Sequence, residues 1–74
     1  MNDETKKIVD RLFDKEEWLQ QLSLKTDRSI KTIRRHYIGK EYKIPIKFQL
    51  IAFDLATKLY KKQMKRVSNM KVNF

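Results

Sequence analysis

Apolar residues recur at the spacing of a helix in four parts of the chain, and no useful stretch alternates as a strand does. The first two apolar faces consist of Ile8, Val9, Leu12 and Phe13, and then of Trp18, Leu19 and Leu22. The third face consists of Ile30, Ile33 and Tyr37, and the fourth of Phe48, Ile51, Ala52, Leu55 and Leu59. The pattern therefore predicts an all-α fold of four helices.

Residues that can cap a helix precede the first two apolar faces. Asn2 or Asp3 can cap the first helix. Asp14 and Glu17 have the spacing of a capping box, in which Asp14 accepts from the Glu17 N–H and the Glu17 side chain reaches back. The helical pattern breaks at Thr26-Asp27-Arg28, so we expect a turn there.

Ser29 is a suitable N-cap for a third helix over residues 29–38, and Gly39 can end it in a left-handed conformation. Pro45 suits the first turn of a fourth helix, because its missing N–H would be unpaired there in any case. That helix can run without interruption over residues 46–67. The sequence thus predicts one domain over residues 1–67, with a frayed basic tail over residues 68–74.

Positive charge is concentrated in the second part of the chain. The 74 residues carry a formal net charge of +9. Residues 1–27 hold 5 basic and 7 acidic side chains, whereas residues 28–74 hold 13 basic and 2 acidic ones. Such a distribution favours a polyanionic partner, with nucleic acid first and an anionic membrane surface second. A solvated lysine-rich surface is the simpler alternative.

Several classes of function lack the residues they need. With no Cys, one His and one Gly, the chain offers no thiolate, no metal site and no glycine-rich phosphate loop. We therefore expect neither an enzyme nor a cofactor, and no small-molecule effector is evident. No apolar run approaches the length of a membrane span, which leads us to expect a cytoplasmic protein without a membrane partner.

The third helix has two chemically different faces. At about 100° per residue, Ile30, Ile33 and Tyr37 gather on one side. The opposite side carries Lys31, Arg34, Arg35 and Ile38. One face can thus pack on the second helix while the other presents positive charge, which is the layout of a DNA recognition helix. An ordinary amphipathic helix with a solvated basic face is the alternative.

Residues 22–35 resemble the helix-turn-helix of Cro and phage-repressor (XRE-like) regulators. The family pattern Leu-Ala-x-x-x-Gly-Val-Ser-x-x-Thr-Ile is matched at Leu22, Ser29, Thr32 and Ile33. Asp27 occupies the position at which the family pattern has the glycine of the turn. Asp tolerates the left-handed conformation better than most residues. The resemblance extends over roughly residues 16–60 and implies a DNA-binding regulator.

A second, local resemblance is to the TetR-type helix-turn-helix. The pattern Ser-x-x-Thr-x-Tyr-Arg-His-Phe-x-x-Lys-Glu is matched by a set of residues in and after the third helix. These are Ser29, Thr32, Arg35, His36, Tyr37, Lys40 and Glu41. Arg34 replaces the family tyrosine, and the large ligand-binding domain of that family is absent from this sequence.

The resemblance and the helix faces together select the candidate DNA contacts. Candidates for reading bases are Ser29, Lys31, Arg34 and Arg35. Ile30 also maps to a groove position in the resembling families, but its face points toward the core. Candidates for contacting phosphate are Arg28, Thr32, Lys40, Lys43 and Lys47. We expect Arg28 to point outward.

Two further side chains have structural interpretations. We expect Trp18 in the core with its N–H at the surface. His36 is expected to pack at the edge of the third helix or to contact phosphate.

The fourth helix carries a second apolar stripe besides its core face. Ile46, Phe53, Tyr60 and Val67 are spaced by sevens, with Met64 beside them. This spacing favours a partner helix, most simply in a homodimer, with Phe53, Tyr60, Met64 and Val67 as the candidate contacts. Alternatively, the first helix covers this stripe. The end of this helix carries a basic run, which is a solvated face or a second DNA or membrane contact. It consists of Lys58, Lys61, Lys62, Lys65 and Arg66.

The sequence as a whole predicts sequence-specific binding of double-stranded DNA by a small transcriptional regulator, a repressor of phage, plasmid or mobile-element type. Such a protein would be associated with the nucleoid when bound to DNA. An excisionase-like recombination accessory protein needs the same contacts and remains an alternative. A protein-interaction or inhibitor module that uses the basic face is another.

Overall fold

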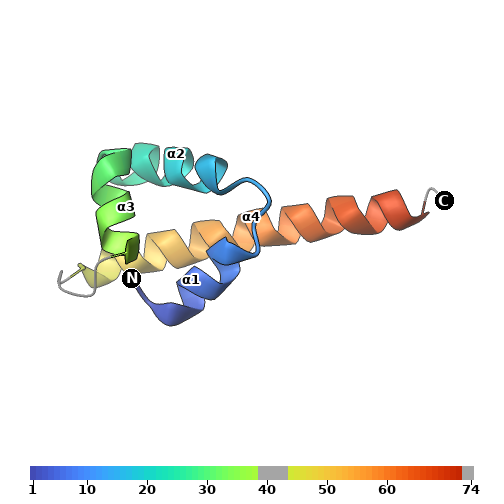
Figure 1. Cartoon of the computed structure of the whole chain (residues 1–74), viewed down its shortest axis with the longest axis horizontal. Helices are drawn as coiled ribbons and strands as arrows, with labels where there is room; N and C mark the ends of the chain where they lie inside the picture. Colours follow the sequence, from blue (N-terminus) through green and yellow to red (C-terminus); the bar gives the residue numbers. More distant parts are fainter. Residues whose placement is uncertain (39–43, 73–74) are drawn as a thin grey trace.

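The computed structural model describes the chain over residues 1–38 and 44–72, with side chains described as far as Asn69. Within these residues there are four helices and no strand, which confirms the all-α prediction. The helices are α1 (Asp3–Asp10), α2 (Lys15–Thr26), α3 (Ile30–Ile38) and α4 (Ile46–Val72), as labelled in Figure 1.

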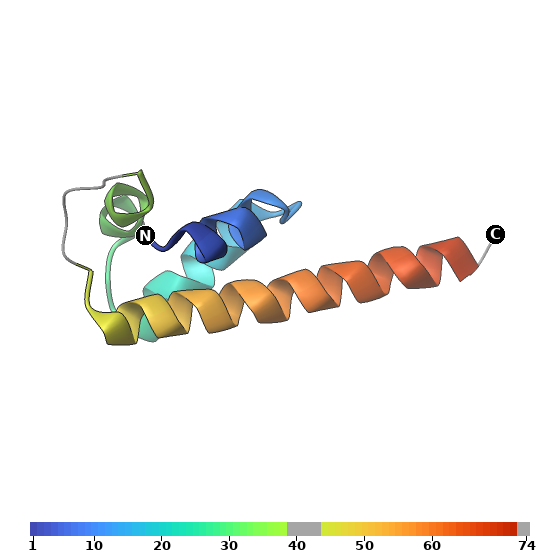
Figure 2. The same ribbon diagram turned by 90° about the horizontal axis from the view of Figure 1, so that it is seen from below.

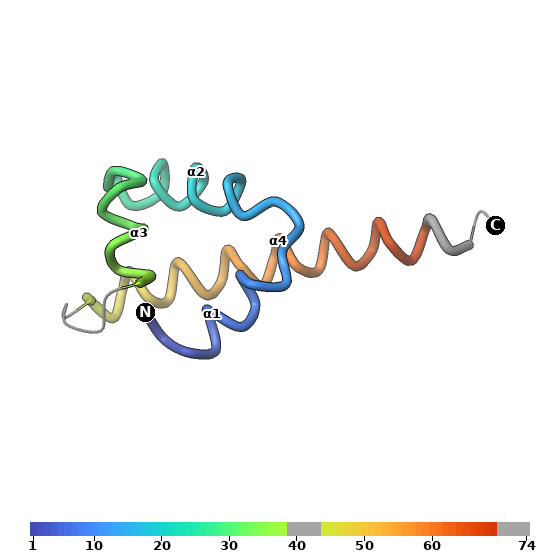
Figure 3. The backbone as a smooth tube through the Cα atoms, in the orientation of Figure 1, coloured from blue at the N-terminus to red at the C-terminus, as the bar shows by residue number. Residues whose placement is uncertain are grey.

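The long helix α4 forms the axis of the molecule, and the other helices pack against its first part. Helices α1 and α2 both contact α4, and α3 bridges the end of α2 and the beginning of α4 (Figure 1). The last turns of α4 extend beyond the other three helices, as both ribbon views and the backbone tube show (Figures 2 and 3). The molecule is therefore elongated, at 47 × 22 × 18 Å.

The predicted N-caps of α1 and α2 are confirmed. The Asn2 side-chain oxygen accepts a hydrogen bond of 2.8 Å from the Glu4 N–H. Asp14 Oδ1 accepts one of 3.1 Å from the Glu17 N–H. The Glu17 carboxylate accepts from Gln21 Nε2, one turn onward in α2, instead of reaching back to complete the capping box. Both caps satisfy helix N–H groups that have no partner within the helix.

A single hydrophobic core joins all four helices. Its buried apolar members are Val9, Leu12, Trp18, Leu19, Leu22, Ile33, Phe48, Ala52, Leu55 and Ala56. Trp18 is 1% exposed, and its indole N–H donates to the Ala52 carbonyl over 3.2 Å. The prediction that this N–H reaches the surface was wrong, because α4 supplies the acceptor within the core.

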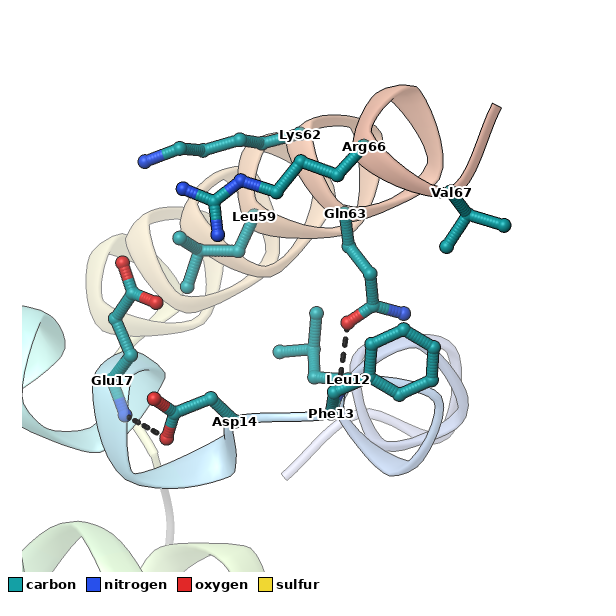
Figure 4. Close-up of a pocket in the computed structure, with 9 residues that line it drawn as sticks. All are labelled: Leu12, Phe13, Asp14, Glu17, Leu59, Lys62, Gln63, Arg66 and Val67. Carbon is teal, nitrogen blue, oxygen red and sulfur yellow. Dashed lines mark hydrogen bonds between the residues drawn. The ribbon is translucent and has the colours of Figure 1, made fainter. Parts of the chain in front are cut away.

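The connection between α1 and α2 is fastened to α4 by Gln63. The Gln63 amide oxygen accepts from the Phe13 N–H over 2.7 Å (Figure 4). The Gln63 amide nitrogen donates to the Arg11 carbonyl over 2.9 Å. Helix α1 ends at Asp10, so the helical spacing no longer applies at Phe13. The Phe13 side chain is 77% exposed, which contradicts its predicted place on the apolar face.

Helix α4 begins where it was predicted to begin, at Ile46, but it ends later than predicted. The Pro45 carbonyl accepts the first hydrogen bond of the helix, from the Gln49 N–H at 3.1 Å. The helix then continues through Val72, past its predicted end at Val67. The segment expected to be a frayed tail is therefore helical over residues 68–72, and residues 73–74 lie outside the described residues.

Candidate nucleic-acid interface

The two faces of α3 are arranged as predicted. Ile33 has no exposed surface, and the half-buried Ile30 and Tyr37 pack against the core. The exposed positions of this helix are Lys31, Arg34, Arg35 and Ile38. Because the buried face anchors α3 in the core, the cationic face is held toward solvent by packing.

The turn between α2 and α3 is closed by side-chain hydrogen bonds. Asp27 adopts the left-handed conformation, with φ 55° and ψ 34°, at the position where the resembling family has glycine. The Ser23 hydroxyl donates to the Arg28 carbonyl over 2.5 Å. The Thr26 hydroxyl donates to the Leu22 carbonyl over 2.7 Å. Ser23, which stands at the alanine of the family pattern, and Asp27, which stands at its glycine, are therefore both compatible with a tight turn.

Ser29 and Thr32 form the beginning of α3. The Ser29 hydroxyl oxygen accepts from the Thr32 N–H over 3.2 Å, and the two hydroxyls are hydrogen-bonded to each other at 2.8 Å. The Ser29 carbonyl accepts from the Ile33 N–H over 3.1 Å. Ser29 is thus the predicted N-cap, and its hydroxyl lies at the N-terminal end of the cationic face, where α3 presents the positive end of its dipole.

Arg34 forms an ion pair with Glu16 of α2. The distance from Arg34 Nη2 to Glu16 Oε1 is 2.7 Å, and the side chains are 56% and 59% exposed. An exposed pair of this kind contributes about 0–1 kcal/mol to stability. Arg34 therefore has a defined position beside α2, yet little free energy opposes its transfer to another anion.

Arg28 does not point away from the molecule as predicted. Its guanidinium lies over the ring of Phe48, with 5.3 Å from the guanidinium carbon to the ring centroid, and the residue is half-buried. A guanidinium over an aromatic ring is attracted to the negative face of the ring. The side chain therefore lies along the beginning of α4, a position that its neighbours in the sequence could not indicate.

Three cations surround a shallow hollow beside the turn. Lys25, Arg28 and Lys47 line it, together with Thr26, Pro45 and the apolar Phe48 and Ile51. Lys25 was not among the predicted contacts, although its place in the last turn of α2 could have indicated it. The hollow also lies at the N-terminal end of α4, where free N–H groups favour an anion. Of the other predicted phosphate contacts, Lys40 and Lys43 lie outside the described residues.

His36 belongs to the core and not to the interface. It is 9% exposed, and its ring meets the Phe48 ring edge-on with 5.5 Å between centroids. Burial lowers the pKa of His36, and the positive charges of Arg28 and the N-terminal amino group lower it further. The ring therefore packs against Phe48 and away from the exposed cationic face, so the structure does not place it for the predicted phosphate contact.

The candidate dimer contacts on α4 differ in how far α1 covers them. Tyr60 is half-buried and packs against the core, and Val67 is half-buried. Phe53 and Met64 are each 38% exposed, and Ile46 is 76% exposed. A single copy of the chain therefore leaves part of the second stripe exposed, and pairing of this stripe with a second copy stays a prediction.

Other kinds of site find no support in the described part of the chain. Residues 1–38 and 44–69 contain no group of three or more His, Asp or Glu side chains placed to hold a metal ion. No helix among the described residues combines the length and hydrophobicity needed to cross a bilayer. Comparisons with protein-family models, curated proteins and solved structures gave no match. Only the geometry and the charge of the interface therefore support it.

Proposed function

We propose that the protein binds double-stranded DNA in a sequence-specific way, with α3 in the major groove, and acts as a small transcriptional repressor of phage, plasmid or mobile-element type. The observation that carries the proposal is the cationic face of α3. Lys31, Arg34 and Arg35 are exposed on a helix whose opposite face is fixed by the fully buried Ile33. The B-DNA major groove is wide enough for such a helix.

The chemistry of this face suits base edges. Arg34 and Arg35 can each donate two hydrogen bonds to O6 and N7 of guanine, and Lys31 can donate to the same acceptors. The Ser29 hydroxyl at the start of α3 can bond a base or a phosphate, and Thr32 lies beside it. These residues would supply the sequence preference.

The hollow beside the turn suits the DNA backbone. Lys25, Arg28 and Lys47 supply positive charge there, and the beginning of α4 supplies N–H donors. Contacts of this kind hold a protein in register on the duplex without reading its sequence. Lys40 and Lys43 stay candidates for phosphate contacts on the sequence alone. A protein with this role acts in the cytoplasm and on the nucleoid.

A selection from random DNA duplexes tests the proposal directly. The bound fraction would be sequenced after binding at two salt concentrations. We expect an enriched motif and an affinity that falls steeply with salt, because each phosphate contact releases counterions. An enriched palindrome would support a dimeric repressor, and an enriched asymmetric site an excisionase-like accessory role. An absence of binding near physiological salt would overturn the proposal and direct the search to a protein partner of the basic face.

A further inference from the structure

An apolar seam runs along α4 and meets the core only in part, at Tyr60. Its residues follow one another in alternating steps of four and three, which is the heptad pattern of a coiled coil. They are Ile46, Leu50, Phe53, Thr57, Tyr60, Met64 and Val67. The core face of the same helix consists of other residues, namely Phe48, Ala52, Leu55 and Ala56. We call the first set the α4 seam.

The α4 seam is incompletely covered in a single copy of the chain. Ile46 is 76% exposed, Leu50 is 64% exposed, and Phe53 and Met64 are each 38% exposed. These four are among the large apolar residues that remain exposed in the described part of the chain. Removing this apolar surface from water is favourable, so a second helix would be stabilised by packing along the seam.

We propose that the α4 seam pairs with the α4 seam of a second copy in antiparallel orientation, about a two-fold axis between Lys58 and Leu59. Each heptad has two seam positions. In an antiparallel coiled coil, the first position on one helix faces the second position on the partner helix. With this axis, Thr57 faces the partner's Tyr60, Phe53 faces the partner's Met64, and Leu50 faces the partner's Val67. Every seam residue from Leu50 to Val67 then faces a seam residue of the partner, and only Tyr60 faces a polar one, Thr57.

Charge at the edge of the seam favours this orientation and register. Asp54 and Lys61 both directly follow a seam residue, and both are exposed. Antiparallel pairing about the proposed axis brings Asp54 next to the partner's Lys61, and the two-fold axis repeats this pair. In a parallel pair the same two residues would face the uncharged Gln49 and Ala56. The antiparallel arrangement therefore gains two ion pairs that the parallel one lacks.

The proposed axis also sets the distance between the two α3 helices, a consequence that rests on the proposed function. Phe48 contacts both His36 of α3 and Arg28 of the turn, so it marks the place of the recognition helix along α4. The two copies of Phe48 would be separated by about 21 residues of helical rise, or about 32 Å. Recognition helices in dimers of this kind contact half-sites about 34–36 Å apart. The dimer would thus suit a palindromic site.

Charge exchange tests the orientation in the absence of DNA, so its outcome is independent of whether the protein binds DNA. Asp54→Lys and Lys61→Asp should each raise the Kd of the dimer about tenfold, because each replaces two attractions by two repulsions. Analytical ultracentrifugation measures this Kd. The double variant should restore the wild-type Kd. The matched control is Lys58→Asp, which makes the same change of charge as Lys61→Asp at a position off the seam. It also removes the 3.0 Å ion pair between Lys58 and Asp54.

Disulfide cross-linking gives a second readout, because the chain has no cysteine of its own. Phe53→Cys and Met64→Cys chains of different mass, mixed and oxidised, should form mixed disulfides in preference to self-linked ones. Self-linked dimers of each variant alone would indicate parallel pairing and overturn the proposal. A wild-type chain that stays monomeric at high concentration, or a double charge variant that fails to recover, would overturn it as well.

Discussion

Arg34, at the centre of the cationic face of α3, is held 2.7 Å from the Glu16 carboxylate of α2. The two residues are 18 positions apart in the chain, and the turn at Asp27 brings them together. Glu16 therefore fixes where the guanidinium lies in the free protein. It also places a negative charge next to a residue that we propose to enter the major groove.

The first prediction concerns Glu16. Glu16→Gln should tighten duplex binding about fivefold, because an exposed ion pair worth at most about 1 kcal/mol no longer competes with DNA for Arg34. Titration of a labelled duplex measures this change. Glu4→Gln is the matched control, since it makes the same change of charge at an exposed position on α1. If Glu16→Gln weakens binding instead, Glu16 positions Arg34 for its base and does not compete with it.

The second prediction concerns the arginines themselves. Arg34→Ala and Arg35→Ala should each cost about 1–3 kcal/mol of DNA binding, because each removes a proposed guanine contact. Thermal unfolding should change little, because both side chains are exposed. Lys62→Ala, an exposed lysine on the opposite part of the molecule, removes one positive charge as a control. Equal losses in all three variants would indicate non-specific charge attraction and contradict base reading by α3.

Local signals in the sequence predicted α2, the turn and α3. The caps at Asp14 and Ser29 act within one helical turn, so a few neighbouring residues determine them. The buried position of Ile33 follows from spacing along a single helix. The cationic face was found for the same reason, since it is the complement of that buried face.

Contacts between distant segments were not predictable in the same way. The indole N–H of Trp18 finds its acceptor at Ala52, 34 residues away, and Arg28 finds the Phe48 ring. Both partners lie on α4, whose placement against α2 no local pattern specifies. His36 was expected to pack at the edge of α3 or to contact phosphate, yet its ring is buried against Phe48 of α4. In each case the tertiary neighbour decided the outcome.

The third prediction tests the turn. Asp27 has φ 55°, a region that costs most residues about 1–2 kcal/mol and costs glycine almost nothing. Asp27→Gly should therefore preserve or slightly raise the free energy of unfolding. Asp27→Val, which makes the same change of charge, should lower it by at least about 1 kcal/mol. Urea unfolding followed by circular dichroism measures both, and equal stability of the two variants would contradict the left-handed turn.

The fourth prediction separates the two faces of α3. Ile33→Ala should lower the free energy of unfolding by about 2–4 kcal/mol, because it leaves a cavity around a fully buried position. Ile38→Ala truncates the same residue type on the exposed face of the same helix, and should change stability by less than about 0.5 kcal/mol. Urea unfolding measures the two variants side by side. A large loss in Ile38→Ala would mean that Ile38 is buried in an interface in solution.

The last prediction concerns the pH dependence of stability. The pKa of His36 is lowered in the folded protein, by burial first and then by the charges of Arg28 and the N-terminal amino group. Unfolding exposes the ring and returns its pKa to about 6.5. Above that pH the ring is neutral in both states and contributes no pH dependence. As the pH falls below about 6.5, the ring is protonated to a larger extent in the unfolded state than in the folded state, so folding is weakened.

Thermal unfolding between about pH 7.5 and pH 5.5 measures this effect above the range in which most carboxylates titrate. We expect the melting temperature to fall steadily below about pH 6.5 in the wild type, with a slope in the free energy of unfolding of at most about 1.4 kcal/mol per pH unit. His36→Gln removes the imidazole and should reduce the slope below about pH 6.5, even if it lowers stability at every pH. The N-terminal amino group, whose pKa burial also lowers, contributes the same pH dependence to both chains. A wild-type profile that is already flat would mean that His36 keeps its ordinary pKa and is therefore accessible to water, against its buried position beside Phe48.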